Sequence, residues 1–464
     1  MTEVSAKLQR AEGQDDIERP EIPAAAATTV NKPRIVIVGG GAGGLELARR
    51  LGARYGRRSH DVVLVERNRT HVWKPLLHEI ATGSLDANLD EVSYRSHGHR
   101  WGYRFCHGSL ESIEREARTI TIAPLLDDDG TELIGRHTIA YDYLVIAVGS
   151  ITNDFGTPGV REHCIFLDDQ AAADRFRDRL LNHCLRVSRA MSAGAEAEAY
   201  VRIGIVGGGA TGVELAAELY NAAHALRDEG LEAFDETRLK VVLLEAGPRL
   251  LPALPEGLAA AAQAELEKLG VRVLVGRAVT AVSEAAIIAS AEQIPCDLMV
   301  WAAGVRGADL LQGVGGLETS PSRQLLVRPT LQTTLDDRIF ALGDCCFYKM
   351  PGSERPVPPR AQSAHQMAAT VARNLDRMIA NQPLVPFVYR DHGSLVSLSR
   401  FSTVGSLMGN LVGGRLAVEG RIARLVYLSL YRMHLLAVHG WVKGLALIAI
   451  GHVNRILRPK LKLH

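Results

Sequence analysis

Short apolar runs recur along the chain, and most of them end at a glycine or an acidic residue. They occupy residues 34–38, 61–66, 141–150, 202–206, 239–245 and 296–304. Apolar runs of this kind are typical of parallel strands that are buried on both faces. Helical patterns at 45–51 and 170–191 lie between the strands. This alternation predicts an α/β fold built from Rossmann-like units.

Two glycine-rich loops follow two of these strands, about one domain apart. Their glycines are Gly39, Gly41 and Gly44 in the first copy and Gly207, Gly209 and Gly212 in the second. In such a loop the first glycine permits a tight turn, the second leaves room for a pyrophosphate, and the third lets the following helix pack closely. The helix N-terminus then favours the anion. Two complete copies predict two dinucleotides on one chain, and electron transfer between them.

An acidic residue ends the next strand in each unit. Glu66 closes the run 61–66, and Glu245 closes the run 239–245. A carboxylate at this place is expected to accept the ribose hydroxyls of an adenosine. Glu245 would also repel a 2′-phosphate, which favours NADH over NADPH. Arg249 lies four residues further on and would weaken this preference if it bound the phosphate.

The layout of the first unit returns in the second. In each, an acid precedes an apolar strand that ends at glycine, from Asp142 to Gly149 and from Asp297 to Gly304. We therefore include Gly149 and Gly304 among the candidate cofactor-binding residues. The predicted organisation is a disordered tail (1–32), a first nucleotide-binding domain in two parts (33–160 and 316–384), a second one inserted between them (161–315), and a C-terminal module (385–464).

Composition narrows the functional classes. The chain is 47% hydrophobic and 23% charged, with a net charge of +1, so nucleic acid is not an expected partner. Its six cysteines form no CxxC pair and no zinc spacing, which predicts reduced thiols in a cytoplasmic protein and no metal site. Residues 1–32 lack the pattern of a secretory signal. No window is apolar for long enough to suggest a transmembrane span.

The last part of the chain is basic and apolar. Residues 420–464 contain no Asp or Glu, and their cations are Arg421, Arg424, Arg432, Lys443, Arg455, Arg458, Lys460 and Lys462. This composition predicts amphipathic helices that lie on an anionic membrane surface. A helix pair packed on the core, with its basic face in water, is the alternative.

Several of these segments resemble the type II NADH:quinone oxidoreductases, the single-subunit, non-proton-pumping NADH dehydrogenases. The resemblance covers about residues 33–464 and is most specific at 71–78, 147–159, 207–218, 340–344 and 361–366. It implies that the first unit holds FAD and the second binds NADH. It also implies that two electrons pass to a membrane quinone, ubiquinone or menaquinone, in a respiratory chain. The expected protein is a peripheral homodimer on the cytoplasmic face of the cell membrane.

The same resemblance assigns roles to individual residues. Asp344 would bind the ribityl chain of FAD, although a helix-capping Asp is the alternative. Lys74 would stabilise the flavin or its phosphate, or else be a solvated surface lysine. Glu214, expected in the first turn of its helix, would lie near the nicotinamide and flavin, or simply complement the helix dipole.

One more motif concerns the quinone. The helix that begins at Ala361 would run beneath the flavin and border the quinone site. Gln362 and Gln366 are four residues apart and so share a face, and we take them with Glu214 as candidate catalytic residues. His365 is expected to be a surface histidine rather than a proton donor.

Other flavoprotein classes fit less well. Disulfide reductases need a CxxxxC pair early in the first domain, and residues 45–80 contain no cysteine. Ferredoxin-type reductases usually lack a basic, apolar C-terminal segment of the kind that binds membranes. Sulfide:quinone oxidoreductases use two distant cysteines, for which Cys164 and Cys345 or Cys346 are candidates, but the complete second loop and Glu245 favour NADH. A redox-sensing flavoprotein that holds NADH without turnover is a further alternative.

Overall fold

The computed structural model describes residues 32–85, 91–194, 199–228, 236–353, 355–398, 402–408, 415–419 and 433–457. The chain divides into a short unit, Met1–Lys32, and a large unit, Pro33–His464. The predicted disordered tail falls almost entirely outside the described residues. All elements below belong to the large unit.

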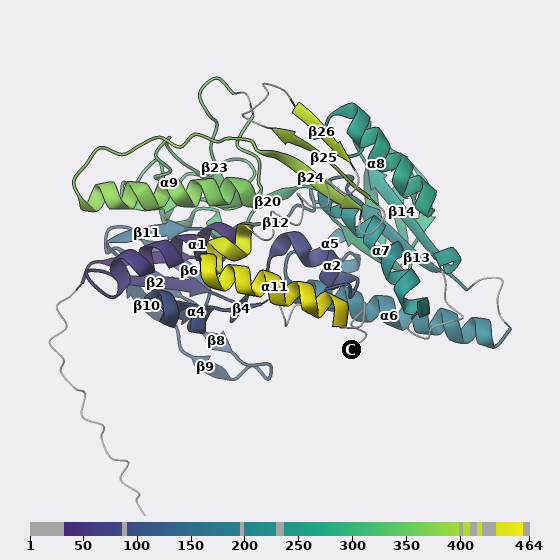
Figure 1. Ribbon diagram of the computed structural model, residues 1–464, viewed down its shortest axis with the longest axis horizontal. Coiled ribbons are helices and arrows are strands. Elements are labelled where there is room, and N and C mark those ends of the chain that lie inside the picture. The colour runs from purple at the N-terminus through teal and green to yellow at the C-terminus, as the bar shows by residue number, and fades with distance from the viewer. Residues whose placement is uncertain are drawn as a thin grey trace, which may run out of the picture. The chain divides into compact units, whose positions relative to one another are not determined.

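The first nucleotide-binding unit is built on a five-stranded parallel sheet in the order β22-β11-β1-β2-β5. Its strands are β1 (Arg34–Val38), β2 (Asp61–Glu66), β5 (Arg104–His107), β11 (Tyr143–Ile146) and β22 (Ile339–Ala341). The middle of β1 is fully buried, as predicted for a strand covered on both faces. Helices α1 (Ala42–Leu51) and α9 (Ala361–Ile379) pack side by side against each other (Figure 1).

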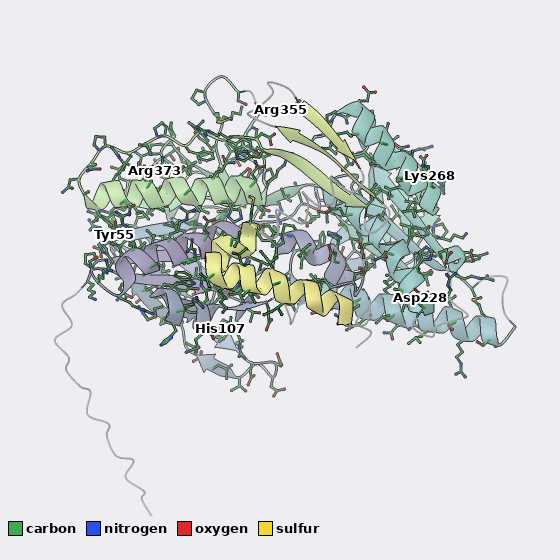
Figure 2. All side chains as sticks on the ribbon, in the orientation of Figure 1. Tyr55, His107, Asp228, Lys268, Arg355 and Arg373 are labelled. Carbon is green, nitrogen blue, oxygen red and sulfur yellow. The ribbon has the colours of Figure 1, made fainter. Side chains whose placement is uncertain are left out.

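The second unit repeats this plan with a four-stranded parallel sheet in the order β15-β14-β13-β19. Its strands are β13 (Val201–Val206), β14 (Leu239–Glu245), β15 (Arg272–Val275) and β19 (Leu298–Trp301). The accompanying helices are α6 (Gln170–Ser192), α7 (Ala210–Asp228) and α8 (Glu256–Leu269). Figure 2 labels Asp228 at the end of α7 and Lys268 near the end of α8.

The topology confirms the predicted insertion of one unit into the other. After the second sheet, the chain returns to the first, where β22 pairs with β11. The crossing is made by an antiparallel ribbon of β12 (Ser150–Thr152) and β20 (Val305–Gly307). The α/β class with two parallel sheets is therefore correct, while the exact domain boundaries remain predictions.

Smaller elements complete the unit. Antiparallel sheets are formed by β6 (Leu110–Glu114), β7 (Thr119–Ile122) and β10 (His137–Ala140), by β16 (Val279–Ser283), β17 (Ala286–Ala289) and β18 (Glu292–Pro295), and by β24 (Gly393–Leu398), β25 (Ser402–Met408) and β26 (Arg415–Glu419). Two-stranded pairs are β3 (Thr70–His71) with β4 (Val92–Ser93), β8 (Leu125–Leu126) with β9 (Glu132–Ile134), and β21 (Leu325–Leu326) with β23 (Cys346–Phe347). Further helices are α2 (Leu77–Ala81), α4 (Tyr94–Trp101), α5 (Val160–His163) and α11 (Trp441–Leu457).

Two predicted helices differ slightly at their ends. The helix expected from residue 45 begins at Ala42, because the last glycines of the loop already belong to its first turn. The helix expected over 170–191 extends to Ser192. Its start is fixed by Asp169, whose side chain accepts a 2.9 Å hydrogen bond from the backbone N–H of Ala172.

The C-terminal segment is described only in part. His97 Nε2 lies 2.7 Å from the backbone oxygen of Val438, which ties this segment to the first unit. On α11, the apolar side chains of Val442, Leu445 and Ile450 are exposed. Among the described residues, no helix is long and apolar enough to cross a membrane. Most of the predicted basic surface lies outside the described residues: Arg421, Arg424, Arg432, Arg458, Lys460 and Lys462.

Candidate functional site

The first glycine loop leaves an open space at the start of α1. Gly39 has a φ of +104°, and a Cβ there would lie 2.3 Å from the carbonyl oxygen of Ala147. A Cβ on Gly44 would lie 1.9 Å from the oxygen of Gly39. A Cβ on Gly41, in contrast, would meet nothing within 4 Å. Gly39 and Gly44 thus permit close packing, and Gly41 faces the space that a pyrophosphate would need.

The second loop repeats this division of roles. Gly207 has a φ of +117°, and its Cβ would lie 2.7 Å from the carbonyl carbon of Ala302. A Cβ on Gly212 would come within 2.0 Å of the oxygen of Gly207, whereas Gly209 has open space around it. The two loops therefore have the same geometry as well as the same sequence pattern.

The two acids hold equivalent places beside these loops. Glu66 accepts a 2.7 Å hydrogen bond from the N–H of Gly40 and a 3.1 Å bond from the N–H of Asn68. Glu245 accepts 2.7 Å bonds from the N–H groups of Gly208 and Gly247. Backbone donors therefore fix each carboxylate at the end of its strand, next to the loop. This arrangement fits the predicted contact with a ribose.

Arg249 is bound to its own turn. Its Nη1 donates to the carbonyl oxygens of Leu251 and Leu254, at 3.2 and 3.0 Å, and its Nη2 donates to that of Pro252 at 3.0 Å. The guanidinium would have to leave these carbonyls to reach a 2′-phosphate. Its position therefore supports the preference for NADH that Glu245 predicts.

Asp344, Ser150 and Lys74 come together beside Gly149. Ser150 Oγ donates to Asp344 Oδ2 at 3.1 Å, and Lys74 Nζ donates to the carbonyl oxygen of Ser150 at 3.3 Å. Burial raises the pKa of Asp344, while Ser150 and Lys74 act in the opposite direction. Asp344 lies inside the short helical turn Gly343–Cys345, whose N-cap is Leu342, so it is not a capping residue.

Gly149, a predicted cofactor-binding residue, has open space at the position that a side chain would occupy. Its φ is +74°, and a Cβ there would meet no atom within 4 Å. Gly149 thus opens a space next to the Asp344 carboxylate. The arrangement fits a polyol chain that passes between the end of β11 and Asp344.

The start of α9 faces the segment around Arg390. Ala361 is the first residue of α9, after Arg360 at the N-cap. The Nε2 atoms of Gln362 and Gln366 both donate to the carbonyl oxygen of Arg390, at 3.2 and 2.7 Å. The two glutamines therefore share a face, as predicted. Their catalytic role stays a prediction.

Glu214 differs from its predicted placement. The helix α7 begins at Ala210 and has no acidic residue in its first turn, so Glu214 lies just beyond that turn. It is buried, with Oε2 3.7 Å from Nδ1 of His78 on α2. Glu218 is buried too, and burial lowers the pKa of His78 while Glu218 opposes that change. His78 ends the segment 71–78, which the family resemblance marks as specific, but nothing in the sequence predicts its contact with Glu214.

His365 is not the surface histidine that the sequence predicts. Its Nδ1 is hydrogen-bonded to Oε2 of Glu46 on α1, and its ring lies 5.9 Å from that of Trp73. Burial tends to raise the pKa of Glu46, but His365 and Arg50 outweigh it and lower that pKa. The pair was missed because Glu46 and His365 are 319 residues apart.

The cysteines proposed for a sulfide-type mechanism are poor nucleophiles. Cys164, Cys345 and Cys346 are buried and unpaired. Burial raises the pKa of Cys164 and Cys345 to about 12, and it also raises the pKa of Cys346 well above its usual range. A thiol must ionise to attack sulfur. Within the described part of the chain, no His, Cys, Asp and Glu residues cluster as a metal site would require.

Similarity to known proteins decides the family. The model of the pyridine nucleotide-disulphide oxidoreductase family matches residues 33–368. A type II NADH:quinone oxidoreductase from Haemophilus influenzae is 48% identical over 442 residues, which cover 93% of this chain and 99% of that protein. This chain belongs to the type II NADH:quinone oxidoreductases.

A second member of the family is also similar in sequence, and two solved structures share the fold. The type II NADH:quinone oxidoreductase of Mycobacterium tuberculosis is 29% identical, covering 91% of this chain and 87% of that protein. The structure of NDH2 from Plasmodium falciparum in complex with NADH has a TM-score of 0.76 at 20% identity and covers 93% of this chain and all of that one. The sulfide:quinone oxidoreductase of Aquifex aeolicus shares the fold, with a TM-score of 0.65 at 18% identity and coverage of 92% and 95%.

Proposed function

We propose that this type II NADH:quinone oxidoreductase oxidises NADH through bound FAD and reduces a membrane quinone. One observation carries the proposal. Two complete nucleotide loops of equal geometry lie on one chain, and in each a carboxylate accepts a hydrogen bond from a backbone N–H of its loop. A single dinucleotide would need only one of them.

The residues of the first unit fit FAD. Gly41 leaves the pyrophosphate space at the start of α1, Glu66 is fixed for the adenosine ribose, and Asp344 borders the space at Gly149. Lys74 adds a positive charge near Asp344. When bound, FAD accepts a hydride from NADH and passes two electrons to the quinone.

The residues of the second unit fit NADH. Gly209 leaves the pyrophosphate space at the start of α7, and Glu245 is fixed for the adenosine ribose. Gly304, at the end of the neighbouring strand β19, marks the place where the other half of NADH would lie. Glu214, Gln362 and Gln366 are the proposed catalytic residues of the chain.

A quinone as electron acceptor supports a location at a membrane. Quinones dissolve in lipid, so their reductase must touch the bilayer. The exposed apolar side chains of α11 and the basic composition of residues 420–464 support peripheral attachment. We propose the cytoplasmic face of the cell membrane, a role in a respiratory chain with ubiquinone or menaquinone, and a homodimer formed through the C-terminal module.

A spectrum of the purified protein tests this function. Addition of NADH should bleach the visible absorption band of the flavin, and a soluble quinone should then restore it. Repeated cycles would distinguish turnover from a long-lived sensor complex. A flavin that sulfide reduces but NADH does not would overturn the proposal.

Glu245→Gln should weaken NADH binding about tenfold, because a charged acceptor of the ribose hydroxyls is lost. NADPH should be disfavoured less than before, since no carboxylate repels its 2′-phosphate. Calorimetric dissociation constants for both nucleotides measure the change. Glu256→Gln, which neutralises an exposed carboxylate on α8, is the matched control. Equal affinity of the parent protein for the two nucleotides would contradict this role.

Reversing the charges of Arg455, Arg458, Lys460 and Lys462 to Glu should release the protein from anionic vesicles. Each basic residue near such a surface contributes about 1 kcal/mol, so four reversals remove most of the electrostatic attraction. Reduction of a long-chain quinone in vesicles should fall, whereas reduction of a water-soluble quinone should continue. Vesicle co-sedimentation at rising salt follows the binding.

A charge-preserving control separates electrostatics from packing. Arg455→Lys with Arg458→Lys should retain vesicle binding, since the charge is unchanged. If the reversed protein stayed on the vesicles with both quinone activities intact, the basic tail would be only a packed structural element.

A further inference from the structure

The turn that follows β12 contains an exposed aromatic residue, Phe155, with a left-handed backbone conformation. Phe155 has a backbone φ of +53°, and 64% of its surface is exposed. Among the described non-glycine residues with positive φ, it is the only aromatic one. A bulky non-glycine residue is strained in this region of backbone conformation. Because the ring is largely exposed, its burial contributes little stability to offset this strain.

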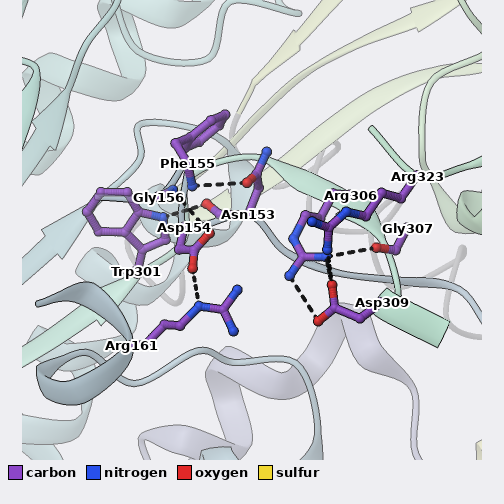
Figure 3. A network of polar contacts seen from close by, with 10 residues as sticks. All are labelled: Asn153, Asp154, Phe155, Gly156, Arg161, Trp301, Arg306, Gly307, Asp309 and Arg323. Atoms are coloured by element: carbon purple, nitrogen blue, oxygen red, sulfur yellow. Dashed lines mark hydrogen bonds and ion pairs between the residues drawn. The ribbon is translucent and has the colours of Figure 1, made fainter. Parts of the chain in front are cut away.

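The rest of the turn is held firmly, which keeps Phe155 in place. Its N–H donates to Oδ1 of Asn153 at 3.0 Å, and Nε1 of Trp301 donates to the carbonyl oxygen of Asn153 at 2.8 Å. Asp154 pairs with Arg161. Figure 3 shows these contacts, with the Phe155 ring on the side of the turn away from Arg161. The anchoring of its neighbours therefore fixes the ring without burying it.

The ring of Phe155 lies close to the second nucleotide loop. A Cβ on Gly304 would lie 2.6 Å from Cζ of Phe155, so the ring covers this glycine. The N–H of Asn153 also donates to the carbonyl oxygen of Gly304 at 3.3 Å. Gly304 follows β19, and the neighbouring Ala302 contacts Gly207 of the loop. Phe155 therefore lies at the carboxyl end of β19, one strand away from the loop.

The order of the strands indicates which part of NADH would lie at the carboxyl end of β19. Glu245 ends β14, the loop follows β13, and Gly304 follows β19, in the sheet order β14-β13-β19. Ligands of such sheets lie across the carboxyl ends of the strands. With the adenosine at β14 and the pyrophosphate at β13, the remaining half of NADH extends over β19.

We propose that Phe155 packs against the nicotinamide half of NADH and positions it at the end of β19. The inference rests on the proposed NADH site of the second unit. Val305, adjacent to Gly304 and 43% exposed, adds a second apolar contact. A planar aromatic amide is a suitable partner for the exposed ring. The strained turn thereby presents a preformed surface to the ligand.

Two ligands separate this role from a general effect on binding. ADP-ribose contains the adenosine and pyrophosphate but lacks the nicotinamide. In the FAD-loaded protein, Phe155→Ala should weaken NAD⁺ binding about tenfold, as expected for the loss of a stacking contact. ADP-ribose affinity and FAD content should not change. Phe155→Tyr keeps the ring and should retain NAD⁺ affinity. Titration calorimetry measures each dissociation constant.

A glycine variant tests whether the residue serves the fold instead. Glycine adopts a φ of +53° without strain, so Phe155→Gly should unfold at the same or a higher temperature while losing NAD⁺ affinity as the alanine variant does. Three results would overturn the inference: unchanged or tighter NAD⁺ binding in Phe155→Ala, an equal loss for ADP-ribose, or a lower unfolding temperature for Phe155→Gly. If the unmodified protein bound neither nucleotide, the proposed function itself would fail.

Discussion

Gly209→Ala is expected to weaken NADH binding by about 10- to 100-fold while FAD stays bound, and Gly41→Ala should release FAD while NAD⁺ affinity is retained. In each case the new methyl group meets no protein atom within 4 Å. It enters the space through which a pyrophosphate would approach the helix N-terminus. The two substitutions are chemically identical and differ only in the sheet that carries them.

Flavin absorbance of the purified variants and calorimetric titration with NAD⁺ measure this double dissociation. Because neither methyl group collides with the fold, both apoproteins should unfold at the temperature of the unmodified apoprotein. Loss of the same cofactor in both variants would contradict the assignment of FAD to the first loop and NADH to the second.

Gly44→Ala and Gly212→Ala are expected to destabilise the protein itself by about 3 kcal/mol or more. A Cβ at these positions would lie 1.9 and 2.0 Å from backbone oxygens, those of Gly39 and Gly207. A backbone atom cannot move aside as a flexible side chain can, so helix and strand must separate. Urea unfolding of the apoproteins measures the loss, with Gly41→Ala as the matched control. Unchanged stability would show that the close helix–strand packing is not required.

The local sequence pattern was sufficient to predict the strands and nucleotide loops of this protein. The largely apolar runs at 34–38 and 202–206 form buried parallel strands, and glycine spacing alone located both nucleotide loops. The acids Glu66 and Glu245 were found because they end the next strand in each unit. Such features depend on neighbours within a few residues or on one strand–helix–strand unit. The sequence carries them directly, and it also supported the family assignment.

The tertiary structure decided which distant side chains meet. Glu46 pairs with His365, and Ser150 with Asp344, across sequence separations of 319 and 194 residues. No local pattern encodes such pairs, because each forms only when the second unit is inserted and the chain returns to the first sheet. The burial of Glu214 and the exposed, left-handed Phe155 have the same origin. Local periodicity determined the strands and loops, whereas contacts between elements that are distant in the sequence determined the surroundings of these side chains.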